Sequence, residues 1–278
     1  MPERYVLIGE NVSSSPSPRM MNAAFEALGL DSVYETSNIG RNQLSVDFAK
    51  LRDAGVSGLN VTVPHKSSMV RFLDSLDEFS SRIGAVNTVK REGASYVGYN
   101  TDVDGVLGPL KSRGHSRIRT AFVLGTGGAS RAVCEALRQL GCEELVVFSR
   151  DPRRAGDFLR FMGAALPGVR LKVTSIGSPP PWNPELVFNA SPIGTKGIPL
   201  PPEVPRMLAE GSIVFDAVYF PVETELITQA KQRNCTTICG HEMLLHQGVK
   251  AVRIWTGRNA PVQVMKTALL ETLGVVAS

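Results

Sequence analysis

Short apolar runs alternate with stretches in which apolar residues recur at helical spacing along the first third of the chain. This alternation is typical of α/β units with parallel strands. Ser17 and Pro18 form the start signal of one helix, and Gly29 ends it. The pattern predicts strands over 5–9, 31–36, 58–63, 85–89 and 94–98, and helices over 18–28, 43–54 and 66–83, the last of these interrupted near Asp74.

A second α/β unit follows the polar and basic stretch 111–119, where composition alone places a domain boundary. An apolar run, a glycine-rich turn, a helix and a second apolar run form a βαβ unit of about 30 residues. A proline-rich connection from Gly177 to Pro184 precedes further strands. The pattern predicts strands over 119–125, 144–149, 185–189 and 212–218 and a helix over 128–140.

Length and composition fit an α/β protein of two domains. The chain has 278 residues, of which 43% are hydrophobic and 20% are charged, as in average globular proteins. A net charge of +4 is too small to indicate nucleic-acid binding, whereas small acidic ligands remain good partners. No signal peptide or run of about 18 apolar residues is present, so we expect a cytoplasmic protein that does not bind membranes. The four cysteines are expected to be reduced thiols.

A glycine-rich turn carries the clearest ligand signal. It follows an apolar strand and opens a helix, which is the context of a dinucleotide-binding turn in a Rossmann domain. Gly125 permits the tight turn, and Gly127 lets backbone amides approach a pyrophosphate at the positive end of the helix. Ser130 stands where a third glycine is common, and it is still small enough for close packing. The predicted cofactor-binding residues of this turn are Gly125, Thr126, Gly127, Gly128 and Ala129.

The tip of the next strand decides between NADP and NAD. A carboxylate there accepts hydrogen bonds from the ribose hydroxyls, whereas guanidinium groups pair with a 2′-phosphate. Ser149, Arg150, Arg153 and Arg154 therefore favour NADP (NADPH). Asp151 instead favours NAD, which remains the alternative cofactor.

Polar residues gather where strands of the first domain end, which is where open α/β sheets bind ligands. Lys66 follows the strand at 58–63, Asn87 lies in a glycine-flanked segment, and Asp102 follows the strand at 94–98. Each residue alone also fits a surface or turn position. Their combination is much more specific.

The chain resembles the shikimate dehydrogenase family. The matching motifs extend over nearly the whole chain in the family's order. They are SPSP at 15–18, NVTVPHK at 60–66, GAVNT at 84–88, GYNTDVDG at 98–105, GTGGASRA at 125–132, NASPIG at 189–194, DAVYFP at 216–221 and GHEMLLHQ at 240–247.

The resemblance implies a two-domain α/β enzyme. Residues 1–103, completed by C-terminal helices at 240–278, would form the substrate-binding domain, and 104–239 an inserted Rossmann domain for NADP. The substrate would lie in the cleft between them. The implied reaction is the reversible, NADPH-dependent reduction of 3-dehydroshikimate to shikimate, a step of the shikimate pathway toward chorismate and the aromatic amino acids.

The resemblance also implies the site residues, and it implies no metal site. Lys66 and Asp102 correspond to the catalytic pair, in which the lysine donates a proton to the ketone oxygen as hydride arrives. Substrate contacts correspond to Ser15, Ser17, Thr62, Lys66, Asn87, Asp102, Tyr219 and Gln247. Further cofactor contacts correspond to Ser149, Arg150, Arg154, Asn189, Ala190, Ser191, Ala217 and Gly240.

Two alternatives remain open. One is an NAD-dependent quinate/shikimate dehydrogenase, because quinate differs from shikimate only near the carboxylate. The other is a non-catalytic homologue that senses its ligands, against which the presence of both Lys66 and Asp102 argues. Ser14, Met21, Asp151 and Thr195 depart from common family residues and could alter specificity. We expect a monomer or a homodimer.

Overall fold

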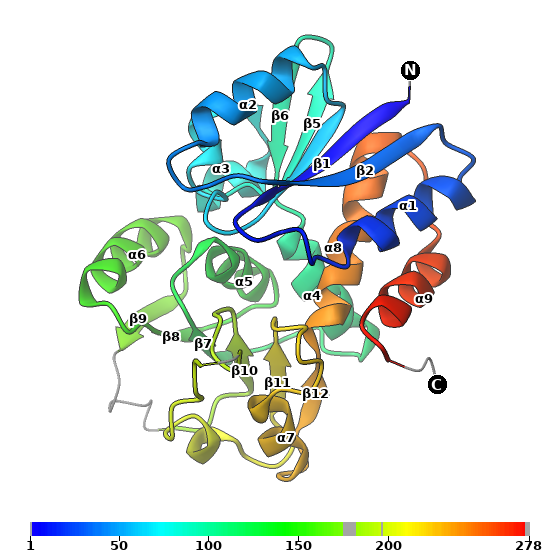
Figure 1. Cartoon of the computed structure of the whole chain (residues 1–278). Helices are drawn as coiled ribbons and strands as arrows, with labels where there is room; N and C mark the ends of the chain where they lie inside the picture. Colours follow the sequence, from blue (N-terminus) through cyan, green and yellow to red (C-terminus); the bar gives the residue numbers. More distant parts are fainter. Residues whose placement is uncertain (1, 175–181, 196, 276–278) are drawn as a thin grey trace. The chain divides into compact units, whose positions relative to one another are not determined.

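A computed structural model of the chain describes residues 2–174, 182–195 and 197–275 (Figure 1). The chain divides into two compact units. Unit 1 consists of Met1–Gly105 and Leu244–Ser278, and unit 2 of Val106–Met243. The divisions fall inside α4 (Asp102–Ser112) and α8 (Gly240–Thr256). The polar stretch 111–119 is therefore not the boundary.

Unit 1 contains a mixed six-stranded sheet. Its strand order is β2-β1-β3-β5-β6-β4, in which β5 runs antiparallel to both β3 and β6. Gly93, with φ of 63°, provides the left-handed residue of the hairpin between β5 and β6. The strands are β1 (Glu3–Gly9), β2 (Ser32–Asn38), β3 (Gly58–Val61), β4 (Ser75–Leu76), β5 (Thr88–Glu92) and β6 (Ser95–Tyr99).

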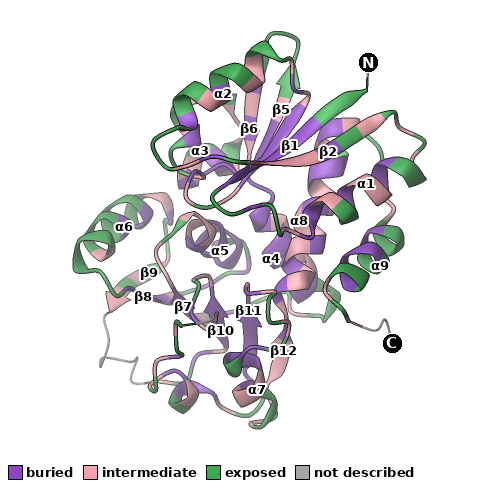
Figure 2. Cartoon of the chain, viewed as in Figure 1, coloured by how far each residue is buried: buried purple, intermediate pink, exposed green. Residues whose placement is uncertain are grey.

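The helices of unit 1 come from both ends of the chain. Figure 2 shows that α2 exposes its outer face to solvent, whereas residues of β1 are buried. Besides the C-terminal part of α8, the helices of unit 1 are α1 (Ser17–Ala27), α2 (Leu44–Asp53), η1 (Met69–Phe72), α3 (Glu78–Ile83) and α9 (Val262–Thr272).

The expected helix over 66–83 is wrong over most of its length. The segment forms η1, then the short strand β4 and then α3. Asp74 explains the change, since its amide donates to the carbonyl of Tyr96 and its carboxylate accepts from the Tyr96 amide at 2.7 Å. Pairing with β6 therefore overrides the helical spacing of the apolar residues.

Helix α1 begins one residue earlier than predicted. Ser17 is its first residue and Pro16 is the cap, so Ser17 is not the N-cap expected from the sequence. The hydroxyl of Ser15 accepts from the Ser17 amide at 3.2 Å. Ser15 thus satisfies a backbone donor that the proline cap cannot.

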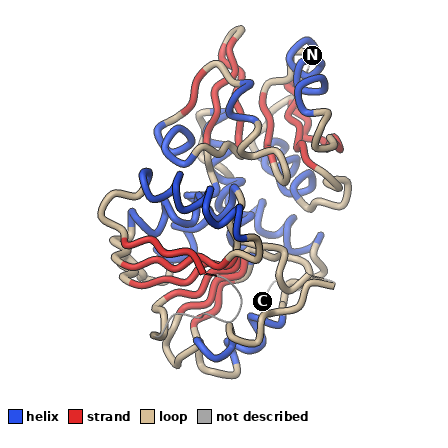
Figure 3. The backbone as a smooth tube through the Cα atoms, turned by 90° about the vertical axis from the view of Figure 1, so that its left-hand side faces the viewer, coloured by secondary structure: helices blue, strands red, loops and turns tan. Residues whose placement is uncertain are grey.

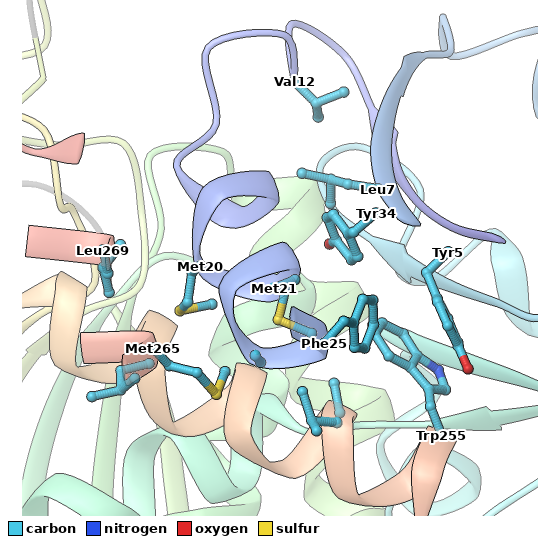
Figure 4. Close-up of a cluster of buried hydrophobic side chains, with 14 residues drawn as sticks. Tyr5, Leu7, Val12, Met20, Met21, Phe25, Tyr34, Trp255, Met265 and Leu269 are labelled. Atoms are coloured by element: carbon cyan, nitrogen blue, oxygen red, sulfur yellow. The ribbon is translucent and has the colours of Figure 1, made fainter. Parts of the chain in front are cut away.

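The last helices complete a core of unit 1. Figure 4 shows Trp255 of α8 beside Tyr5 and Phe25, with ring centroids 4.6 Å apart for Tyr5 and Trp255. The indole Nε1 of Trp255 donates to the carbonyl of Val89 at 2.9 Å. Leu269 of α9 belongs to the same buried cluster. The C-terminal segment is therefore an integral part of unit 1.

Unit 2 contains a fully parallel six-stranded sheet, which Figure 3 shows as a twisted array of neighbouring strands. Its order, β12-β11-β10-β7-β8-β9, is that of a doubly wound dinucleotide-binding fold. The predicted α/β fold class is confirmed. The strands are β7 (Thr120–Leu124), β8 (Glu144–Phe148), β9 (Arg170–Thr174), β10 (Leu186–Asn189), β11 (Ile213–Asp216) and β12 (Thr236–Ile238).

The helices of unit 2 lie between these strands in the sequence. Most of the proline-rich connection predicted from Gly177 to Pro184 lies outside the described residues. Among the described residues, no helix is long and apolar enough to cross a membrane. The helices are α5 (Gly128–Gln139), α6 (Pro152–Ala165), η2 (Pro205–Met207) and α7 (Glu225–Lys231).

Gly58→Ala and Gly156→Ala should change stability in opposite directions. A Cβ at Gly58 would lie 2.6 Å from Trp255 Nε1 and 2.8 Å from the Val89 carbonyl oxygen, so it would disturb their hydrogen bond. We expect this overpacking to lower the free energy of unfolding by about 1–3 kcal/mol. Gly156 lies inside α6 with open space around its Cα, and alanine there should stabilise by roughly 0.5–1 kcal/mol. Urea denaturation followed by circular dichroism measures both changes. An unchanged or raised free energy of unfolding in Gly58→Ala would contradict this packing.

Candidate active site

An ion pair lies at the ends of two strands of unit 1. Lys66 lies in the segment that follows β3, and Asp102 begins α4 a short turn after β6. The Nζ atom of Lys66 donates to Oδ2 of Asp102 at 2.5 Å, and the two side chains are only 14% and 5% exposed. Burial of a charged pair costs desolvation energy, so it requires further polar partners.

Asn87 supplies one of these partners. Its Nδ2 atom donates to Oδ1 of Asp102 at 2.9 Å, so each carboxylate oxygen has its own donor. The Oδ1 atom of Asn87 accepts from the Thr101 amide at 2.7 Å. Gln247, from α8, places its Oε1 atom 3.4 Å from Nδ2 of Asn87. The structure thus brings together Lys66, Asn87, Asp102 and Gln247, which the sequence analysis selected.

A second set of buried polar residues, which was not predicted from the sequence, adjoins this group and consists of Tyr34, Asn60 and Thr88. Asn60 donates to the Asn87 carbonyl at 3.1 Å and to Thr88 Oγ1 at 3.0 Å. The Tyr34 hydroxyl donates to Asn60 Oδ1 at 2.8 Å, and burial raises the pKa of Tyr34. Asn60 belongs to the motif at 60–66 and could have been selected from it. Tyr34 lies in a weak strand pattern without such a signal.

His65 fixes the segment that carries Lys66. Its ring is 1% exposed, and its Nε2 atom lies 2.8 Å from the carbonyl oxygen of Ile39. A carbonyl can only accept, so Nε2 carries the proton that joins them. The residue is a buried structural neighbour of the ion pair.

Ser15 and Ser17 form a separate pair at the start of α1. Their hydroxyl groups are 3.1 Å apart, with Ser15 as the donor. Among the described residues, no hydrogen bond joins either serine to the Lys66 group. Thr62 also has no side-chain hydrogen bond to that group within the described part of the chain, although its carbonyl accepts from the His65 amide.

The glycine-rich turn of unit 2 joins β7 to α5. Gly125 has φ of 108°, a conformation that glycine tolerates, and Gly127 is the N-cap of α5. A glycine cap offers no side-chain acceptor, so the first amides of α5, starting with Gly128 and Ala129, are free to bind an anion. Ser130 is fully buried, and its hydroxyl has no hydrogen-bond partner among the described residues. These features fit a dinucleotide pyrophosphate.

The tip of β8 presents arginines beside a capping carboxylate. Asp151 Oδ1 accepts from the amides of Arg153 at 2.9 Å and Arg154 at 3.3 Å, and so it caps α6. Ser149 is 5% exposed and donates to the Asp151 carbonyl at 3.0 Å. Arg150 is exposed. The carboxylate of Asp151 is therefore engaged by its own helix.

Two further strand ends of unit 2 are joined by a buried amide and a buried carboxylate. Asn189 ends β10, and its Nδ2 atom donates to Oδ1 of Asp216, the last residue of β11, at 2.9 Å. Burial raises the pKa of Asp216 to about 6, although its hydrogen-bond donors act in the opposite direction. The predicted contacts Ala190, Ser191, Ala217 and Tyr219 follow these two residues in the sequence.

Gly240 has a packing role within unit 2. A Cβ there would lie 2.5 Å from the carbonyl oxygens of both Ala217 and Val218. The missing side chain thus allows the start of α8 to approach the segment after β11.

Two parts of the chain match known families. Residues 7–89 match the shikimate dehydrogenase substrate binding domain, and residues 240–270 match the shikimate 5′-dehydrogenase C-terminal domain. The shikimate dehydrogenase (NADP(+)) of Moorella thermoacetica is 40% identical over 284 residues, covering 96% of this chain and 92% of that protein. The chain belongs to the shikimate dehydrogenase family.

Solved structures agree with this family assignment. The Thermus thermophilus shikimate 5-dehydrogenase, in complex with NADP(H) and shikimate, has a TM-score of 0.83 and 32% identity, and the match covers 98% of this chain and 100% of that one. The Corynebacterium glutamicum quinate dehydrogenase, in complex with NAD, has a TM-score of 0.85 and 29% identity, with 97% and 99% covered. The resemblance seen in the motifs is confirmed. Both activities named for these structures occur on the fold of the shikimate dehydrogenase family.

The raised pKa of Asp216 predicts a pH-dependent contribution to stability. Between its ordinary value of 3.8 and about 6, the folded state binds a proton that the unfolded state has released. Stability from this group is therefore fully present below pH 3.8 and is lost as pH rises through 6. Relative to Asp216→Asn, which has nearly the same shape and no titration, the native chain should lose roughly 3 kcal/mol across this window.

Urea denaturation of both proteins at several pH values measures this difference. Titration of all other groups cancels in the comparison. A constant difference in the free energy of unfolding from pH 4 to pH 7 would contradict the raised pKa of Asp216.

Proposed function

We propose that the chain is an NADP-dependent shikimate dehydrogenase that reversibly reduces 3-dehydroshikimate to shikimate. The observation that carries the proposal is the buried ion pair of Lys66 and Asp102, at 2.5 Å, in a chain of this family. Relatives over the full length carry the name shikimate dehydrogenase (NADP(+)). The implied place of the reaction is the shikimate pathway.

Lys66 is the proton donor in this proposal. NADPH, when bound, supplies the hydride that reduces the ketone carbon. Negative charge then develops on the ketone oxygen, and the ammonium of Lys66 both stabilises this charge and transfers a proton to it. In the oxidation of shikimate, the neutral amine of Lys66 accepts the hydroxyl proton.

Asp102 orients this lysine. Because Asn87 holds Oδ1 and Lys66 holds Oδ2, the carboxylate cannot rotate without breaking one of the two hydrogen bonds. The lone pairs that remain on Asp102 can accept from a substrate hydroxyl. Asn87 is 3% exposed and thus acts mainly by holding Asp102 in place.

Ser15 and Ser17 are proposed to bind the substrate carboxylate. Both lie at the positive end of α1, where the helix dipole stabilises an anion. The hydroxyl of Ser17, which accepts from Ser15, is free to donate outward. Family resemblance assigns Thr62, Gln247 and Tyr219 to the remaining polar groups of the substrate.

The arginines at the tip of β8 support NADP as the cofactor. Asp151 is engaged as the cap of α6, which leaves it poorly placed to accept from ribose hydroxyls. Arg150 and Arg154 carry the positive charge that a 2′-phosphate requires. The turn from Gly125 to Ala129, with the hydroxyl of Ser130, would hold the pyrophosphate.

Initial rates with shikimate and quinate, each paired with NADP and NAD, test this function. Fast reduction of cofactor is expected only with shikimate and NADP, measured by the absorbance of the reduced nicotinamide. Comparable or faster rates with quinate and NAD would establish the quinate/shikimate alternative instead. Ligand binding without any turnover would establish a non-catalytic sensor.

Lys66→Ala should lower kcat by roughly 10²–10⁴-fold, the usual range for loss of a general acid–base residue. Shikimate affinity, measured by calorimetry, should change far less, because Ser15 and Ser17 remain. Lys90→Ala is a matched control, since Lys90 lies on β5 and pairs with Glu92 at 3.5 Å. Near-normal turnover in Lys66→Ala, or an equal loss in Lys90→Ala, would remove Lys66 from the mechanism.

A further inference from the structure

Asp216 is fully buried at the end of β11, yet it has a complete set of partners. Its Oδ1 atom accepts from Asn189 Nδ2 at 2.9 Å and from the Val218 amide at 3.0 Å. Its Oδ2 atom accepts from the Thr224 hydroxyl at 2.6 Å. The carboxylate therefore holds the segment that follows its own strand, including the start of α7, where Thr224 is the N-cap.

Asn189 makes the equivalent contacts on the neighbouring strand. It stands directly opposite Asp216 in the parallel register of β10 and β11. Its second Nδ2 hydrogen is donated to the Ile193 carbonyl at 2.7 Å, and its Oδ1 atom accepts from the Ser191 amide and hydroxyl at 3.1 and 2.7 Å. Both loops at this edge of the sheet, 190–194 and 217–224, are thus tied to one amide and carboxylate pair.

Stability gives no simple reason for a carboxylate at this position. Burial disfavours the charged form of Asp216, and it raises the pKa of this group to about 6. An asparagine of the same shape would avoid that cost. In contrast, the position is well suited to control of the loops, because a buried charge strengthens its hydrogen bonds and makes deviation from their geometry costly.

We propose that Asp216 is a positioning residue for the nicotinamide half of the cofactor, acting through Asn189 and the Val218 amide on the two loops that follow β10 and β11. The inference rests on the proposed function. The adenosine half would bind at the glycine-rich turn and the tip of β8, with which Asp216 has no hydrogen bond in the described part of the chain. The two halves of the cofactor should therefore respond differently to changes at Asp216.

Calorimetric titration of the full chain with NADP and with adenosine 2′,5′-bisphosphate separates the two halves. In Asp216→Ala, the Kd for NADP should rise by about tenfold or more, as expected for loss of 1.4 kcal/mol or more. The Kd for adenosine 2′,5′-bisphosphate should remain within about twofold. Asp216→Asn keeps an acceptor for Asn189 and Val218 and can donate to Thr224 but lacks the charge, so its loss of NADP affinity should be smaller than that of Asp216→Ala but still measurable.

Asn189→Ala provides a second test in case Asp216→Ala does not fold. It removes the link between the loops but leaves Asp216 bonded to Val218 and Thr224, and it should show the same selective loss of NADP affinity. Equal losses for both ligands, or no loss in either alanine variant, would overturn the positioning role. If the native chain does not bind NADP at all, the proposed function fails first.

Discussion

The ion pair of Lys66 and Asp102 determines how the polar groups of unit 1 are arranged. Two charges that are 14% and 5% exposed can be kept only when nearby donors and acceptors replace the water they have lost. Asn87 meets this need directly, by donating to Asp102. Asn60 in turn donates to the carbonyl of Asn87, and the Tyr34 hydroxyl donates to Asn60. One buried pair thus constrains residues on β2 and β3, in the segment before β5 and at the start of α4.

Unit 2 uses the same pairing for a different purpose. In both units an asparagine donates from Nδ2 to Oδ1 of an aspartate across adjoining segments, at 2.9 Å in each case. In unit 1 the second carboxylate oxygen meets a lysine, which can transfer a proton. In unit 2 it meets a threonine hydroxyl, which cannot do so at ordinary pH. The first pair therefore suits chemistry, and the second suits support of loops.

Local patterns of the sequence predict the parts of the structure that local forces determine. The apolar run at 5–9, the glycine-rich turn and the helix after it lie where they were expected, because each carries its own start and stop signals. The segment 66–83 was mispredicted because β4 exists only through pairing with β6, which lies some twenty residues further along the chain. Likewise, Lys66 and Asp102 could be selected from motifs, whereas the support from Tyr34 and the burial of Asp216 depend on contacts between distant residues.

The division of the chain has a consequence for its synthesis. Unit 2 is continuous in sequence, whereas unit 1 needs Trp255 and Leu269 to complete the core around Tyr5. During translation, all residues of unit 2 emerge before the last helices of unit 1 are made. Part of the apolar surface of the first hundred residues therefore stays exposed to solvent until these helices are synthesised. In a truncated or stalled chain, that surface would remain accessible to chaperones and proteases.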